Sequence, residues 1–236
     1  MEYTGTFHHQ GGLNFFPVIG YNGVMKVLLY SFEPSTPGHT NSGLTTAEWI
    51  MEGLNSEYPE VVESKLVVLP PYFSSQEKMR RKLDNFKPDV VIGLHVAPGK
   101  PWVLVEQCAL NIIHTHRCPN WADRQCYMTP IYQNGASALF TSLDTVTMVN
   151  TLRENGVPAE HSFHCGTGIA NYAYYITLEE MKLIHTVFLH VPQAPEEAIV
   201  QDRPLPVFPP WQTAQGIVRW LCGMCSPEQD REGDQS

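Results

Sequence analysis

Short apolar runs alternate with amphipathic stretches along this chain. Residues 26–32, 89–95 and 186–191 are near-continuous apolar runs, which are typical of strands covered on both faces of a sheet. We expect further strands at 65–69, 102–113 and 160–164. Apolar residues at helical spacing predict helices at 44–54, 76–86, 143–155, 171–180 and 211–225. This alternation predicts an α/β fold, a three-layer α/β/α sandwich around a largely parallel, twisted sheet.

The 236 residues have the length of one domain of this class. Residues 1–23 contain scattered glycine and aromatic residues without a period, and we expect them to form a poorly ordered N-terminal extension. Residues 24–225 are predicted to form a single α/β domain. Residues 226–236 are predicted to be a charged tail that frays from the last helix.

The charge balance excludes several classes of partner. Hydrophobic residues make up 43% of the chain, and a net charge of −9 disfavours non-specific binding to nucleic acid or anionic membranes.

No apolar run approaches the roughly 20 residues of a membrane span, and the N-terminus lacks the basic start and apolar core of a secretory signal. Six cysteines in a chain of this size do not resemble a disulfide framework. We therefore expect a cytoplasmic protein with reduced thiols.

Two cysteine-containing segments have spacings seen in metal or redox motifs. Cys222 and Cys225 form a C-x-x-C pattern, but they lie in an apolar helical segment with no second pair nearby. Residues 114–118 and Cys126 offer imidazole and thiolate ligands for zinc. The prolines and aromatic residues around them favour ordinary surface packing instead. The sequence therefore predicts no metal and no cofactor.

Residues 160–180 have the order of a nucleophile turn: a strand, a glycine-rich reversal and a helix. Gly166 and Gly168 allow the sharp reversal. A side chain in the first turn of the helix faces unpaired backbone N–H groups and the positive end of the dipole, which favours a thiolate or an oxyanion. Position 170 stands there, and it is Ala170. The segment is therefore built for a nucleophile that it does not contain.

Glu106 and His190 each interrupt an apolar run. Either residue alone is explained by a structural role, since buried carboxylates and imidazoles are usually paired. Together with the turn at 165–170 they match a base, its orienting carboxylate and a nucleophile position. Working residues of parallel sheets gather at the carboxyl ends of the strands, where Phe32, Leu94 and His190 fall.

These segments resemble the pyroglutamyl peptidase I family of cysteine exopeptidases. Residues 26–34 are similar to the family's opening strand and its Gly-Phe-Glu-Pro-Phe signature, and a loop asparagine, Asn41, follows. Residues 105–111 resemble the motif of the catalytic glutamate, and 166–175 resemble the turn and helix of the nucleophile. Residues 188–192 resemble the motif of the catalytic histidine.

The resemblance implies an omega-peptidase that removes N-terminal pyroglutamate from peptides through a Cys–His–Glu triad. Its members would be position 170, His190 and Glu106, without a cofactor or metal. Backbone N–H groups at 168–171 would form the oxyanion hole. The resemblance also implies a pocket for the pyrrolidone ring, lined by Phe32, Asn41, Leu94 and Ile169.

The chain departs from the family pattern at its centre. The family has its nucleophilic cysteine where this chain has Ala170, and Cys165, five residues upstream, belongs to the strand end rather than the helix start. The chain as written is therefore expected to be inactive. Retention of Glu106 and His190 favours an engineered Cys→Ala variant of an active enzyme over a natural pseudoenzyme that binds pyroglutamyl peptides without cleaving them. The sequence leaves both origins open, together with the physiological peptide and the oligomeric state.

The predicted pocket also lacks an aromatic wall. Ser35 stands where the family signature has its second phenylalanine. Phe15 and Phe16 of the N-terminal extension could supply the missing ring, and the sequence does not decide whether they do.

Overall fold

The computed structural model describes residues 23–34, 39–73, 76–115, 127–182, 184–199 and 204–225. The predicted charged tail lies outside the described residues, as does the predicted N-terminal extension apart from Gly23.

The centre of the fold is a six-stranded sheet with the order β2-β1-β3-β8-β4-β7. Its strands are β1 (Met25–Phe32), β2 (Val62–Leu69), β3 (Val90–Val96), β4 (Val103–Glu106), β7 (Ala159–Ser162) and β8 (His185–Val191). β2, β1, β3 and β8 run parallel to one another. β4 pairs antiparallel with β8 and parallel with β7, so the last two strands of the sheet run in the opposite direction. The predicted largely parallel sheet is confirmed.

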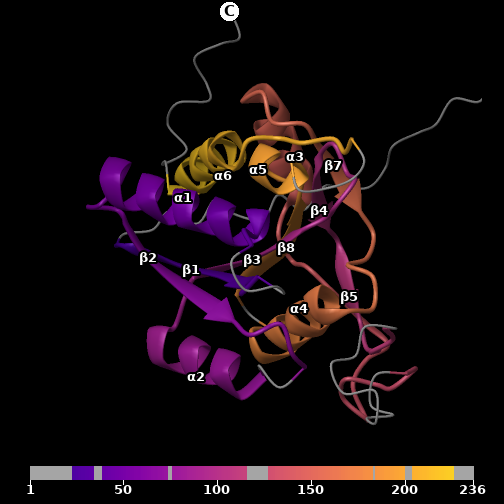
Figure 1. The fold of residues 1–236 in the computed structure, drawn as a ribbon. Helices are drawn as coiled ribbons and strands as arrows, with labels where there is room; N and C mark the ends of the chain where they lie inside the picture. Colours follow the sequence, from indigo (N-terminus) through magenta and orange to yellow (C-terminus); the bar gives the residue numbers. More distant parts are fainter. Residues whose placement is uncertain are drawn as a thin grey trace, which may run out of the picture.

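Helices cover both faces of this sheet (Figure 1). They are α1 (Ser42–Glu57), α2 (Gln76–Phe86), α3 (Thr145–Glu154), α4 (Ile169–Glu180), α5 (Pro195–Ala198) and α6 (Pro210–Cys225). α1, α3 and α6 share one hydrophobic core with the sheet, and α2 and α4 share another on the opposite face. The three-layer α/β/α sandwich is therefore confirmed. None of the described helices is long and apolar enough to cross a membrane.

The burial of β1 explains why its sequence is apolar at nearly every position. Val27 and Leu29 point into the core under α1, whereas Leu28, Tyr30 and Phe32 point into the core under α2 and α4. Successive side chains of a strand point to opposite faces, so a strand covered on both faces needs apolar residues at its odd and its even positions.

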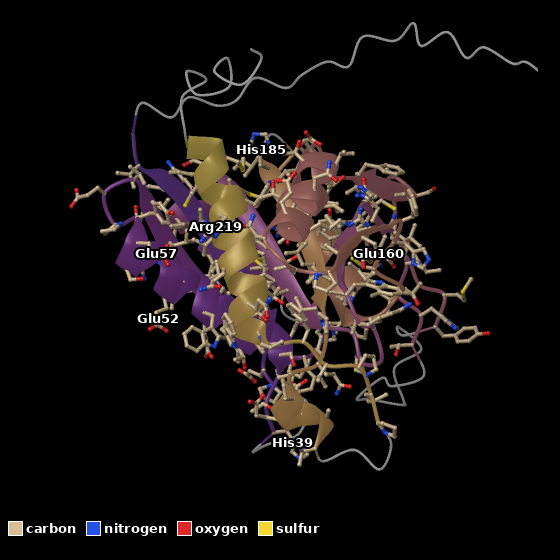
Figure 2. The ribbon with its side chains drawn as sticks, turned by 90° about the horizontal axis from the view of Figure 1, so that it is seen from above. His39, Glu52, Glu57, Glu160, His185 and Arg219 are labelled. Atoms are coloured by element: carbon tan, nitrogen blue, oxygen red, sulfur yellow. The ribbon has the colours of Figure 1, made fainter. Side chains whose placement is uncertain are left out.

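α6 lies along α1 on one face of the molecule (Figure 2). Gly53 permits this close packing, since a Cβ at this position would lie 3.2 Å from Cγ2 of Val218. Ile50 and Leu54 of α1 share their core with Ile217 of α6. The last helix of the fold is therefore held by apolar contact with the first.

The segment predicted as one strand at 102–113 is two strands. β4 ends at Glu106, and β5 (Cys108–Leu110) leaves the main sheet and pairs antiparallel with β6 (Ala138–Phe140), which the sequence pattern did not predict. The Asn171 side chain of α4 holds the far end of β5, because it accepts from the Leu110 N–H and donates to the Leu110 carbonyl. A side chain thus supplies the hydrogen bonds that another strand would have made.

Ser42 joins the start of α1 to α5, a short helix that the sequence pattern also did not predict. The Ser42 N–H and hydroxyl both donate to the Glu197 carboxylate, and the Ala194 N–H donates to the Ser42 hydroxyl oxygen. Burial raises the pKa of Glu197, against the lowering effect of these hydrogen bonds. This buried link fixes α5 against the end of the sheet where the main cavity lies.

Ser42→Ala is expected to destabilise the fold by about 1–3 kcal/mol, because it leaves one oxygen of the Glu197 carboxylate and the Ala194 N–H without their buried partner, while the Ser42 N–H still donates to the other oxygen. The matched control is Ser56→Ala, an exposed serine in the last turn of the same helix, which should change stability by less than about 0.5 kcal/mol. Urea unfolding of both variants measures the difference. Equal stability of the two would show that the link contributes nothing.

Candidate active site

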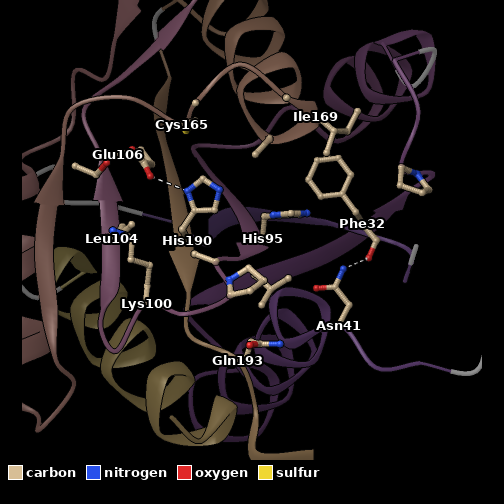
Figure 3. A pocket seen from close by; sticks show the side chains of 18 of the residues that line it. Phe32, Asn41, His95, Lys100, Leu104, Glu106, Cys165, Ile169, His190 and Gln193 are labelled. Carbon is tan, nitrogen blue, oxygen red and sulfur yellow. Dashed lines mark hydrogen bonds and ion pairs between the residues drawn. The ribbon is translucent and has the colours of Figure 1, made fainter. Parts of the chain in front are cut away.

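A cavity of about 1220 Å³ opens at one end of the sheet. Phe32, His95 and His190 line it from the carboxyl-terminal ends of β1, β3 and β8. Glu106 lines it from β4, and Ile169 from the start of α4 (Figure 3). Five elements that are distant in the sequence therefore contribute to one site.

Glu106 and His190 form a hydrogen-bonded pair, with 2.7 Å between Nδ1 of His190 and Oε1 of Glu106 (Figure 3). The Glu106 side chain is 1% exposed and the His190 side chain 13%. β4 makes this contact possible by running antiparallel to β8, so that Glu106 lies opposite Phe188. Phe188 and His190 are two residues apart and point to the same face, which makes Glu106 and His190 diagonal neighbours across the strand pair. The pair therefore arises from strand direction and register together.

Ala170 is the second residue of α4, after Gly168 at the N-cap, and it lines the cavity. The turn before it depends on Gly166, whose φ of +77° is a conformation that side-chain-bearing residues rarely adopt. The N–H groups of a first helical turn have no acceptor within the helix, and they carry the positive end of the dipole. Position 170, where the sequence predicts a nucleophile, thus lies beside unpaired N–H groups at the positive end of the helix dipole. Its side chain is a methyl group.

Cys165 lies closer to the Glu106–His190 pair than its place in the sequence suggested. Its sulfur, a carboxylate oxygen of Glu106 and a ring nitrogen of His190 all lie within 4.8 Å of one another. β7 ends at Ser162, and the loop that follows lines the cavity as far as Cys165. Burial raises the pKa of the Cys165 thiol well above its ordinary value, and the nearby Glu106 carboxylate adds to this shift.

Three of the four residues predicted to form the pocket line the cavity: Phe32, Asn41 and Ile169. Leu94 does not. It is fully buried in the core under α1, and the next residue along β3, His95, faces the cavity instead. Because side chains of a strand alternate between faces, only one of these two neighbours can reach the site.

Asn41 serves as a structural connector at the cavity wall. Its side-chain oxygen caps α1 by accepting from the Gly43 and Leu44 N–H groups. Its side-chain amide donates to the Phe32 carbonyl at 2.8 Å (Figure 3). The asparagine thus ties the end of β1 to the start of α1 and fixes the backbone that carries the Phe32 ring.

His95 and Phe73 are among the cavity residues that the sequence did not predict. The His95 ring lies edge-on to Phe32 at 5.3 Å and to His190 at 5.8 Å between centroids. Burial, with a smaller effect of His190, lowers the pKa of His95 to about 4, so this imidazole is neutral at pH 7. Phe73 lines the cavity and stands edge-on to Tyr172. The polar residue at the end of the apolar run 89–95 was the available signal for His95, whereas no sequence pattern marks Phe73.

Some of the sequence-based alternatives lie outside the described residues. These are Phe15, Phe16, Ser35, His116, Cys118 and Cys126. Cys222 of the C-x-x-C pattern is half-buried in α6, where it packs against the core under α1.

Comparison with known proteins identifies relatives over most of the chain. Residues 25–219 match the family model described as pyroglutamyl peptidase. A pyrrolidone-carboxylate peptidase of Saccharolobus islandicus is 31% identical over 185 residues, covering 77% of this chain and 86% of that protein. One from Clostridium perfringens is 32% identical over 179 residues, covering 74% of this chain and 82% of that protein. The solved structure of a pyrrolidone carboxyl peptidase from Thermococcus litoralis has a TM-score of 0.74 at 26% identity, covering 84% of this chain and 92% of that one.

Asn41→Ala is expected to lower the free energy of unfolding by about 1–3 kcal/mol, since it removes both the helix cap and the donor to the buried Phe32 carbonyl. Asn41→Asp keeps the cap but not the donor, so it should still cost about 1 kcal/mol. Asp144→Ala, which removes an exposed cap of α3, is the control for the cap alone. Denaturant unfolding compares the three variants. An Asn41→Asp variant as stable as the parent would show that the bond to Phe32 contributes nothing.

Proposed function

The chain belongs to the pyroglutamyl peptidase family of cysteine-type hydrolases, and we propose that as written it binds peptides with an N-terminal pyroglutamate without cleaving them. The observation that carries this proposal is Ala170 at the start of α4, in the same cavity as an intact Glu106–His190 hydrogen bond. The groups that would activate and assist a nucleophile are present, and the nucleophile is a methyl group.

The arrangement supports a division of roles. In an active form, a thiolate at position 170 attacks the carbonyl that joins pyroglutamate to the next residue. His190 takes the thiol proton and returns it to the leaving amine, while Glu106 orients the ring and stabilises its charged form. Backbone N–H groups at 168–171 stabilise the oxyanion from the positive end of α4. Without the thiol the first of these steps does not occur.

The aromatic part of the cavity suits the pyrrolidone ring, which is flat, uncharged and bears one amide donor and one acceptor. Phe32, Phe73 and Ile169 supply apolar walls. His95 stands beside Phe32 and is neutral, so it adds a hydrogen-bonding edge without a charge. An uncharged ring is accepted at such a surface at little cost of desolvation.

The intact pair also bears on the origin of Ala170. We propose that a single Cys→Ala change, of the kind made by engineering, silenced an active peptidase, because the partners of the missing thiol are still in place. A natural pseudoenzyme is the alternative. The thiols of Cys108 and Cys165, which form no disulfide, favour the reducing cytoplasm as the compartment.

Ala170→Cys is expected to raise hydrolysis of a pyroglutamyl arylamide at least about a thousandfold, since a lost nucleophile typically costs several orders of magnitude in rate. The new activity should be blocked by alkylating agents. In this background His190→Ala should lower the rate by roughly 10²- to 10⁴-fold, and Glu106→Gln by less.

His185→Ala is the matched control in the same background. His185 lies at the opposite end of β8 and outside the cavity, so its loss should leave the rate nearly unchanged. A folded Ala170→Cys variant that binds peptide and stays inert would identify a natural pseudoenzyme. Substantial turnover by the unmodified chain would overturn the role of position 170.

Phe73→Ala is expected to raise the dissociation constant for a pyroglutamyl peptide about three- to tenfold, because one aromatic wall contributes on the order of 1 kcal/mol. Tyr72→Ala is the control, since this neighbouring ring is half-exposed and does not line the cavity. Isothermal calorimetry of the unmodified chain and both variants tests the assignment. An unchanged affinity in Phe73→Ala would remove Phe73 from the binding surface.

A further inference from the structure

We propose that Glu106, Cys165 and His190 form a binding site for a thiophilic divalent cation of the zinc type. The peptidase reaction leaves Cys165 without a role, although its sulfur lies beside both members of the pair. This inference concerns the unmodified chain and does not depend on its affinity for pyroglutamyl peptides.

The geometry is close to that of a three-ligand metal centre. One sulfur, one carboxylate oxygen and one imidazole nitrogen lie within 4.8 Å of one another, and no other group of three such ligands comes together among the described residues. With metal–ligand distances of about 2.0–2.3 Å, neighbouring ligand atoms of a tetrahedral centre stand roughly 3.3–3.8 Å apart. The sulfur therefore needs to approach by at most about 1.0–1.5 Å, a movement within the reach of side-chain rotation.

Charge compensation is a second and independent argument. Glu106 has no exposed surface, and its Oε2 finds no hydrogen-bond partner among the described residues. Such an atom loses its hydration without replacement, which is costly. A divalent cation bound to this carboxylate and to the Cys165 thiolate makes a centre with no net charge, which suits the buried position.

The ligand types define the class of cation. A thiolate and an imidazole favour zinc and cobalt over magnesium and calcium, which take oxygen ligands. All three side chains line the cavity, so a fourth coordination position is open to it. Three protein ligands with one open position are the pattern of zinc sites that bind water or substrate. Ala170 lines the same cavity and adds only a methyl group to it.

Coordination changes the protonation of the site in a defined way. The metal–sulfur bond forms as the Cys165 S–H bond breaks, and the thiol proton passes to the buffer. Coordination breaks the Glu106–His190 hydrogen bond. Nδ1 of His190 and Oε1 of Glu106 are 2.7 Å apart, and they must separate by roughly 0.6 Å to bind the same metal ion. Metal binding and use of the pair as base and orienter are thus mutually exclusive states of the same residues.

Titration of the full, metal-free chain with ZnCl2 and CoCl2 tests the proposal. We expect binding of about one Zn²⁺ per chain, with a calorimetric enthalpy that varies with the ionisation enthalpy of the buffer because a proton is released. We expect Co²⁺ to give a sulfur-to-cobalt charge-transfer band together with the visible bands of four-coordinate cobalt. Cys165→Ser should abolish the charge-transfer band and weaken Zn²⁺ binding at least about a hundredfold, and Glu106→Gln should weaken it about tenfold or more.

Cys108→Ser is the matched control. Cys108 is also a buried free cysteine, its sulfur donates to the Phe163 carbonyl, and it lies outside the three-ligand group. This variant should bind both metals as the parent does. Cys165→Ala is measured alongside, with circular dichroism of every variant, so that misfolding of the serine variant cannot hide the result.

Three outcomes of the metal titrations overturn the proposal. They are a charge-transfer band that persists in folded Cys165→Ser or Cys165→Ala, equal loss in Cys108→Ser, and the absence of any Zn²⁺ binding by the parent. A thiol-dependent hydrolysis by the unmodified chain that is lost in Cys165→Ser and unaffected by Zn²⁺ would also overturn it, since Cys165 would then act as a nucleophile.

Discussion

The arrangement of the site depends on the burial of the Glu106 carboxylate against His190. A carboxylate without exposed surface requires a partner at hydrogen-bonding distance, and the imidazole at 2.7 Å is that partner. The contact exists because β4 enters the sheet antiparallel to β8, with Glu106 opposite Phe188. A shift of one residue in this register would turn Glu106 toward the core under α1, where its neighbour Val105 now lies.

The direction of β4 also decides how the nucleophile turn reaches the cavity. β7 runs parallel to β4 and ends at Ser162, level with Glu106. Residues 160–166 all line the cavity, so the chain follows the cavity wall from β7 to the turn before α4, and Cys165 lies on this path. Asn171 anchors the helix at that point by bonding both backbone groups of Leu110. The start of α4 is thus fixed by a side chain that belongs to the helix itself.

Much of the fold could be predicted from the local pattern of apolar residues. Much of the site depends instead on how strands that are distant in the sequence pair in the sheet. The apolar runs predicted β1, β3 and β8 because strands buried on both faces leave a direct trace in sequence, and Glu106 and His190 were visible as polar residues within such runs. The alternation of faces within β3 was harder to predict, since its apolar residues point to both faces. His95, the polar residue near the end of the strand, therefore took the place expected for Leu94. The proximity of Cys165 to the pair depends on the course of the chain between β7 and α4, which no local pattern encodes.

The contact between α4 and β4 has a consequence for the position where a nucleophile is expected. The Tyr174 hydroxyl of α4 donates to the backbone carbonyl of Glu106, and Ala170 shares a core with Phe188 of β8. The helix that carries position 170 is therefore packed against both strands of the Glu106–His190 pair. These contacts do not involve the side chain at position 170 as a hydrogen-bonding group, so the spacing between the first turn of α4 and the pair is set by the helix as a whole and not by the residue at that position.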